Sequence, residues 1–157
     1  MIENLDIPHV ASKECTYRLL LPQLQMLTED ESDLIANMAN IVSALKEVFN
    51  FFWVGFYRVM EGQLLLGPFQ GPLACTRIAY GKGVCGIAWK DGKTIIVPDV
   101  EQFAGHITCS NLSRSEIVVP VKRSGAVVAV LDIDSDRLDH FDEVDRLYLE
   151  KIVALLS

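Results

Sequence analysis

Two apolar runs joined by a short turn constrain the fold more than any other feature of the chain. Residues 117–123 and 126–133 flank Ser124-Gly125, a pair that is typical of a tight β-hairpin turn. Residues 126–131 are apolar without interruption, as expected for a central strand that is covered on both faces. The sequence therefore predicts a sheet with other elements packed on each side.

Apolar residues at helical spacing predict helices on both sides of this strand-rich region. One apolar face comprises Leu34, Ile35, Met38, Ile41, Val42, Leu45 and Phe49. A second comprises Val144, Leu147, Tyr148, Ile152 and Leu155, with Asp139 placed to cap its helix. Residues 12–27 predict an earlier helix that is interrupted or kinked at Pro22, which cannot donate a backbone hydrogen bond. Residues 28–31 fit the capping box of the helix that follows.

Between the helices the pattern is that of strands and turns. Residues 52–59 predict a strand with Trp53, Gly55 and Tyr57 on one face and Phe52, Val54 and Phe56 on the other. A short second strand is expected at 64–66, a loop at 67–86, a short helix at 84–89 and a strand at 94–97. Together these elements predict a single α+β domain over residues 1–157, with a largely antiparallel central sheet and the N- and C-terminal helices packed on it.

The charge and hydropathy of the chain exclude several classes of partner. The net charge is −7 and the isoelectric point is about 4.9, which disfavours nucleic acid because phosphates require a basic surface. No apolar run approaches the roughly 20 residues of a membrane span. Residues 1–4 have neither the basic region nor the apolar core of a signal peptide. We therefore expect a cytoplasmic protein that binds neither nucleic acid nor membrane.

A polar segment at residues 105–116 carries the strongest candidate for a reactive group. Cys109 lies there beside His106 and Arg114, and Glu116 directly precedes the apolar run 117–119. A strand fixes the position of the groups that its adjoining loop carries, so binding and catalytic residues concentrate at such places. Cys75 and Cys85 lie upstream in glycine-rich sequence, while Asp132 and Asp134 end the next strand on one side of it. We expect these segments to surround one pocket.

The spacing of the four cysteines favours redox chemistry over a metal site. In a reducing compartment cysteines serve as buried apolar residues, metal ligands or redox thiols. No C-x-x-C pair is present, and only His106-x-x-Cys109 resembles the close ligand pair of a zinc site. A structural metal therefore remains a minor alternative, and we expect no metal. Cys15 sits among apolar residues at helical spacing, where a small buried side chain is the favoured interpretation.

An ordered set of motifs gives the chain a family resemblance from about Glu31 to the C-terminus. The motifs are Trp53-Val54-Gly55-Phe56-Tyr57, Gln70-Gly71-Pro72-Leu73-Ala74-Cys75, Gly81-Lys82-Gly83-Val84-Cys85-Gly86, Gly105-His106-Ile107 with Cys109, Ser115-Glu116-Ile117-Val118-Val119-Pro120 and Leu131-Asp132-Ile133-Asp134-Ser135. In this order they resemble the free methionine-(R)-sulfoxide reductases, which are single-domain oxidoreductases of the GAF fold. The sequence departs from the family pattern at Ser110, where an aspartate is expected.

The resemblance implies a role for each matched position. It implies Cys109 as the nucleophile, Cys75 as the usual resolving cysteine and Cys85 as a third cysteine that can join a disulfide. It places Trp53 and Tyr57 around the methyl end of the substrate. Glu116, Asp132 and Asp134 match acidic residues that bind the substrate and assist catalysis. It further implies a homodimer, thioredoxin as the external reductant in the repair of oxidised methionine, and no organic or metal cofactor.

The chemistry of sulfoxide reduction agrees with these residue types. A cysteine thiolate attacks the sulfoxide sulfur while the oxygen takes up a proton, which a carboxyl group of raised pKa supplies. The product is methionine and a cysteine sulfenic acid, which condenses with a second thiol to a disulfide. Two other interpretations stay open: a GAF-type sensor domain that binds a small molecule, and a structural dimerisation module. We expect a sensor to sit beside an output domain, for which residues 1–157 leave no room.

Overall fold

The computed structural model describes residues 4–9, 12–107 and 112–157. Its centre is an antiparallel sheet of six strands in the described part of the chain, in the order β3-β2-β1-β6-β5-β4. The strands are β1 (Trp53–Met60), β2 (Gln63–Gln70), β3 (Arg77–Ala79), β4 (Ile95–Val97), β5 (Ser115–Arg123) and β6 (Ala126–Ser135). The predicted hairpin is β5–β6, and its turn at Ser124-Gly125 uses a positive φ at both residues.

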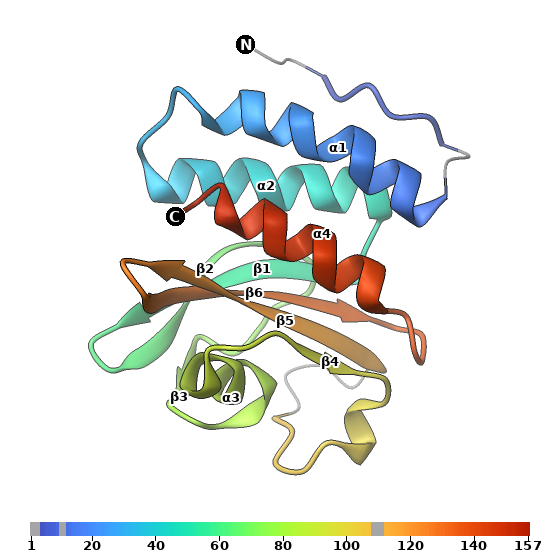
Figure 1. Cartoon of the computed structure of the whole chain (residues 1–157). Coiled ribbons are helices and arrows are strands. Elements are labelled where there is room, and N and C mark those ends of the chain that lie inside the picture. The colour runs from blue at the N-terminus through green and yellow to red at the C-terminus, as the bar shows by residue number, and fades with distance from the viewer. Residues whose placement is uncertain (1–3, 10–11, 108–111) are drawn as a thin grey trace.

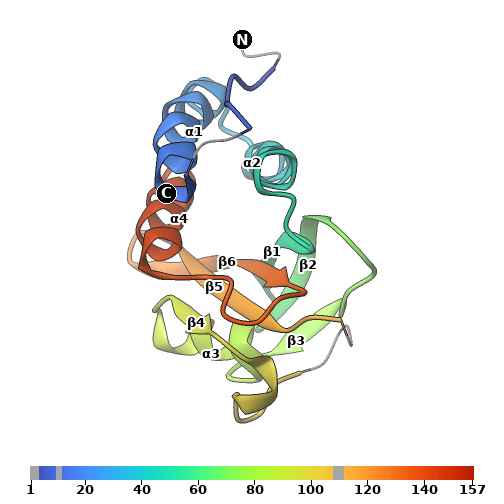
Figure 2. The same cartoon turned by 90° about the vertical axis from the view of Figure 1, so that its right-hand side faces the viewer.

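Helices cover the two faces of the sheet unequally (Figures 1 and 2). One face carries α2 (Leu34–Phe49) and α4 (Glu143–Ala154), and α1 (Lys13–Thr28) packs on these two helices as an outer layer. The opposite face carries α3 (Gly83–Asp91), and the 3-10 turn η1 (Val100–Gln102) follows β4 on this side. No helix in the described ranges is both long enough and apolar enough to cross a membrane.

Side chains from the two faces of the central strands belong to two separate apolar cores. On β1, Val54 and Phe56 are buried against the α1–α2–α4 layer, whereas Trp53 and Tyr57 are buried on the α3 face. On β6, Leu131 faces the helical layer while its neighbours Val130 and Asp132 face α3. Period-two alternation therefore explains why an uninterrupted apolar run forms the central strand β6.

The predicted fold class is confirmed, while several local predictions are wrong. Pro22 does not interrupt α1, because Leu20 and Leu24 on either side of it are fully buried and hold the helix in place; a kink at Pro22 stays a prediction. Thr28 ends α1 instead of opening a capping box, and Asp33 caps α2. Asp142, not Asp139, caps α4.

The region predicted as a long loop contains regular structure. β2 extends to Gln70, and residues 77–79 form the edge strand β3, which pairs with β2. Phe52 was expected on the face of Val54, but it precedes β1 and lines the pocket on the α3 face. Period two holds only within the strand, so it does not fix a residue just outside it. The short helix ending at Asp91-Gly92 is confirmed as α3, with Gly92 in the left-handed conformation at its C-cap.

Candidate functional site

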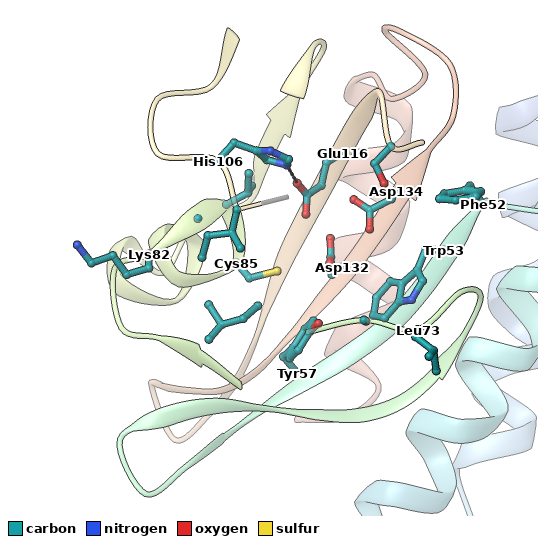
Figure 3. A pocket seen from close by; sticks show the side chains of 16 residues that line it. Phe52, Trp53, Tyr57, Leu73, Lys82, Cys85, His106, Glu116, Asp132 and Asp134 are labelled. Carbon is teal, nitrogen blue, oxygen red and sulfur yellow. Dashed lines mark ion pairs between the residues drawn. The ribbon is translucent and has the colours of Figure 1, made fainter. Parts of the chain in front are cut away.

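Three carboxyl groups converge in a pocket between the sheet and α3 (Figure 3). Glu116 near the start of β5 pairs in register with Asp134 near the end of β6. Asp132 lies two residues before Asp134, so the alternation of side chains along β6 directs both aspartates to the same face. The β5–β6 pairing therefore brings together three acidic residues, as the sequence predicted.

Two members of this acidic cluster are buried, and no lysine or arginine in the described ranges forms an ion pair with it. Glu116 is 5% exposed and Asp132 is 6% exposed. Glu116 Oε1 and Asp132 Oδ1 have no hydrogen-bond partner among the described residues. Lys82 lines the pocket, but its side chain extends away from the carboxyl groups (Figure 3). Buried carboxylates without a cation are unfavourable, so the cluster is suited to a positively charged ligand.

The pKa values of all three acids in the pocket are raised. Burial, followed by the negative charge of Asp134, raises the pKa of Glu116 to about 8. Burial also raises the pKa of Asp132 well above its usual value, as does the neighbouring Glu116. The pKa of Asp134 is raised by burial and by Asp132. At neutral pH Glu116 therefore carries a proton that it can donate.

An aromatic wall stands beside the acids. The Trp53 and Tyr57 rings are stacked with their centroids 6.0 Å apart. Trp53 Nε1 donates a 3.0 Å hydrogen bond to the Pro72 carbonyl, and the Tyr57 hydroxyl donates one of 2.8 Å to the Cys75 carbonyl. These bonds fix both rings, and they also hold the segment that carries Cys75 against the pocket.

Glycine is required beneath the tryptophan. A Cβ atom at Gly55 would lie 2.4 Å from Phe69 Cβ and 2.6 Å from Trp53 Cη2. Gly71, with φ of +141°, would place a Cβ atom 2.6 Å from Trp53 Cδ1. The indole therefore lies over bare backbone at both positions, which explains the glycines in the two motifs around it.

The sequence and the fold are both similar to those of known proteins. The GAF domain family matches residues 28–157. The chain is 58% identical to GAF domain-containing protein A of Dictyostelium discoideum, with 100% of this chain and 99% of that protein covered. It is 38% identical to the free methionine-R-sulfoxide reductase of Saccharomyces cerevisiae, with 93% and 86% covered. The solved structure of free methionine-R-sulfoxide reductase from Neisseria meningitidis in complex with its substrate has 50% identity and a TM-score of 0.95, covering 99% of this chain and 93% of that one.

The chain belongs to the free methionine-R-sulfoxide reductase family. It is thus a GAF-fold member of a family of oxidoreductases, and the resemblance drawn from the ordered motifs is confirmed. The family's name describes reduction of a sulfoxide, a reaction that calls for a reactive thiol near the acidic cluster.

The cysteines of this reductase-family chain lie in different environments. Cys85, on the first turn of α3, points its sulfur into the pocket and is 4% exposed (Figure 3). Burial, followed by the charge of Asp132, raises the pKa of its thiol. Cys75 takes part in a disulfide bond, whereas Cys85 and Cys15 are free thiols. Cys15 was expected to be buried, but it is only partly so. Cys109, the predicted nucleophile, lies outside the described residues.

The segment around Cys109 reaches the pocket on both of its described sides. His106 and Ile107 line the pocket before the undescribed residues, and Ser113 lines it after them. His106 Nε2 lies 3.7 Å from Glu116 Oε1 (Figure 3). Burial lowers the pKa of His106 below its usual value, so the ring is neutral at pH 7 and leaves the acidic charge uncompensated. His106 was not among the predicted site residues, although it belongs to one of the diagnostic motifs.

Proposed function

We propose that the protein reduces free L-methionine (R)-S-oxide to L-methionine with a cysteine thiol as the reductant. The observation that carries the proposal is the cluster of Glu116, Asp132 and Asp134 beside the Trp53–Tyr57 wall. Glu116 and Asp132 are buried, and each has a side-chain oxygen with no hydrogen-bond partner among the described residues. A free amino acid offers an ammonium group to such carboxylates, and a methyl sulfoxide offers a small apolar end to such rings. The family membership of the chain supports the same substrate class.

In the first step, the Cys109 thiolate attacks the sulfoxide sulfur. Protonated Glu116, whose pKa is about 8, donates its proton to the sulfoxide oxygen, because an oxygen that leaves the methionine sulfur must not carry the full negative charge. The oxygen then passes from methionine to Cys109. Methionine is released, and Cys109 is left as a sulfenic acid, so the sulfur of Cys109 is oxidised as that of methionine is reduced.

In the second step, a neighbouring thiol resolves the sulfenic acid. We assign this step first to Cys75, which attacks Cys109 and releases water as an intramolecular disulfide forms. The disulfide-bonded state of Cys75 supports this assignment. Cys85 is the reserve thiol, since the raised pKa of its buried thiol leaves little thiolate at neutral pH. Thioredoxin then reduces the disulfide, and no metal or organic cofactor takes part in the cycle.

The proposed chemistry also indicates where the protein acts and in what assembly. Thioredoxin supplies electrons in the reducing cytoplasm, so we place the protein there. We also propose that it acts as a homodimer, as the family resemblance implies.

The cysteine roles are tested by a single turnover with pre-reduced enzyme and no added reductant. Wild-type protein should release about one methionine per chain, and Cys109→Ser none, because an alcohol is a far weaker nucleophile toward sulfur. Cys75→Ser should release one equivalent and then stall or slow in the thioredoxin-coupled assay. Release of one equivalent by Cys109→Ser would refute the assignment of the nucleophile. Undiminished steady-state turnover by the Cys75→Ser, Cys85→Ser double variant would remove both from the cycle.

The same assay separates the enzyme from a GAF-type sensor. A sensor would bind methionine sulfoxide and leave the mass of the protein and its number of free thiols unchanged. The enzyme forms a new intramolecular disulfide with the R diastereomer, visible as the loss of two alkylatable thiols. Equal oxidation of the protein by the S diastereomer would contradict the proposed stereochemistry.

A further inference from the structure

The acidic cluster also brings a sulfur ligand together with oxygen ligands. One atom each from Cys85, Glu116 and Asp132 lie within 4.8 Å of one another, all three residues being buried. In Figure 3 the Cys85 sulfur points from α3 toward the carboxyl groups of β5 and β6. Glu116 Oε1 and Asp132 Oδ1 lack hydrogen-bond partners among the described residues. Both side chains are more than nine-tenths buried and are directed at the same small space.

We propose that, in the absence of substrate, this pocket binds one thiophilic divalent cation of the Zn²⁺ class through Cys85, Glu116 and Asp132. A thiolate combined with carboxylates fits zinc, which accepts sulfur, nitrogen and oxygen ligands in tetrahedral geometry. The thiolate disfavours Mg²⁺ and Ca²⁺, which prefer oxygen ligands only. Water completes the coordination of such an ion where the protein supplies three ligands.

The ion site would regulate activity and would not serve as a structural site. Its three ligands come from α3, β5 and β6, elements that the sheet and its apolar cores already hold together. An ion there occupies the carboxylates that, on the proposed function, bind the ammonium group of methionine sulfoxide. Cation and substrate therefore exclude each other, and free zinc inhibits the enzyme until substrate displaces it.

Cadmium is a suitable probe, because a thiolate bound to Cd²⁺ gives a ligand-to-metal charge-transfer absorbance in the ultraviolet. The experiment uses protein without reductant, in which alkylation of the denatured chain counts the free thiols; among the described residues these are Cys15 and Cys85. Cys75 is then held in its disulfide and does not compete for the metal. The wild-type protein and the control variant Cys15→Ser should both show absorbance that saturates at about one Cd²⁺ per chain.

Loss of a ligand identifies the site. Cys85→Ser should abolish the charge-transfer absorbance, and Asp132→Asn should weaken Cd²⁺ binding at least about tenfold. Absorbance that persists in Cys85→Ser, or that disappears in Cys15→Ser, would overturn the proposal, as would absorbance that does not saturate. This readout requires no turnover, so it stands or falls independently of the proposed reaction.

Competition links the ion site to the substrate. Free methionine sulfoxide added to the cadmium-loaded wild-type protein should remove the absorbance in a saturable manner, whereas methyl phenyl sulfoxide, which lacks the ammonium group, should not. If the absorbance depends on Cys85 but neither sulfoxide removes it, the mutual exclusion of cation and substrate is wrong, while the ion site itself is upheld.

Discussion

Among single residues, Glu116 is the one that the proposed function uses both to bind the substrate and to donate a proton. It sits at the start of β5, 5% exposed, and faces two other acids. Burial beside other acids disfavours the charged form of a carboxyl group, so the pKa of Glu116 is raised to about 8. The same features supply a proton donor and, when the group is ionised, a partner for an ammonium ion.

The raised pKa of Glu116 predicts a specific dependence of stability on pH. In the unfolded chain Glu116 ionises near pH 4.5, whereas in the folded protein it does so near pH 8. Between these values the folded state binds more protons, so the stability that Glu116 contributes is lost as pH rises. As the pH rises from 5.5 to 8, the free energy of unfolding of Glu116→Gln should increase relative to that of wild type by about 1 to 3 kcal/mol.

Urea unfolding of substrate-free protein measures this difference. Comparing the two proteins at each pH cancels the histidines, whose lowered pKa values act in the opposite direction. A free-energy difference between wild type and Glu116→Gln that is constant from pH 5.5 to 8 would show that the pKa of Glu116 is not raised.

Gly55 predicts a cost for adding a single methyl group. In Gly55→Ala the new Cβ atom would lie 2.6 Å from the Trp53 ring and 2.4 Å from Phe69 Cβ, so the indole must move. We expect a loss of about 1 to 3 kcal/mol in stability and a KM for methionine sulfoxide raised by about tenfold or more.

Gly67→Ala on β2 is the matched control for this substitution. Its Cβ atom would meet the Phe56 carbonyl oxygen at 3.1 Å and does not contact Trp53. It should lower stability modestly and leave KM unchanged. An unchanged KM in Gly55→Ala would show that the position of the indole does not matter for the substrate.

At the scale of elements, α1 and α4 are joined by a buried polar contact on the face opposite to the pocket. Asp145, fully buried on α4, accepts a 2.6 Å hydrogen bond from the Tyr17 hydroxyl and a 2.7 Å bond from Lys13 Nζ, both on α1. It also accepts a hydrogen bond from the backbone N–H of Asp142, which completes the capping box of α4.

Removing Asp145 should therefore destabilise the helical layer without affecting catalysis. We expect Asp145→Ala to lose about 2 to 4 kcal/mol, because the Tyr17 hydroxyl and the backbone N–H of Asp142 lose their acceptor. Lys13 keeps its ion pair with Asp142 and its hydrogen bond to the His140 carbonyl. Tyr17→Phe should lose only about 1 kcal/mol. Thermal and urea unfolding measure both, and kcat/KM at a temperature where the variants are folded should equal that of wild type. A loss of kcat/KM in folded Asp145→Ala would connect the helical layer to the pocket.

The elements that were predicted well from the sequence are those whose apolar residues recur at a regular helical or strand spacing. The α2 face, the β1 alternation and the β5–β6 hairpin follow from local spacing, and with them the convergence of Glu116, Asp132 and Asp134. The ends of elements were predicted less well. Pro22 continues a helix because tertiary burial of its neighbours outweighs one missing hydrogen bond, and β3 is a short edge strand of three residues whose pairing with β2 no local pattern indicates.

At the scale of the whole molecule, the sheet separates stability from chemistry. One face supports the α1–α2–α4 layer and the larger apolar core, while the other supports α3, the aromatic wall and the acidic pocket. The β6 strand serves both, with Leu131 and Ile133 in the helical core and Asp132 and Asp134 in the pocket. The register of β6 decides which face carries the acids. A shift by one residue would direct Asp132 and Asp134 into the apolar core under the helices.

We propose that the acidic pocket selects the free amino acid over a methionine sulfoxide within a peptide. A substrate whose nitrogen is an amide brings no charge, so the buried carboxyl groups would remain without a partner. Such a loss amounts to about 2 to 5 kcal/mol, or roughly 30- to several-thousand-fold in specificity.

The most direct test is the ratio of kcat/KM for free and N-acetylated L-methionine (R)-S-oxide in a thioredoxin-coupled assay. We expect the free amino acid to be preferred at least about 30-fold, and Asp134→Asn to weaken use of the free substrate while changing that of the acetylated one little. Comparable values for the two substrates in the wild-type enzyme would show that the acidic pocket does not select the free amino acid.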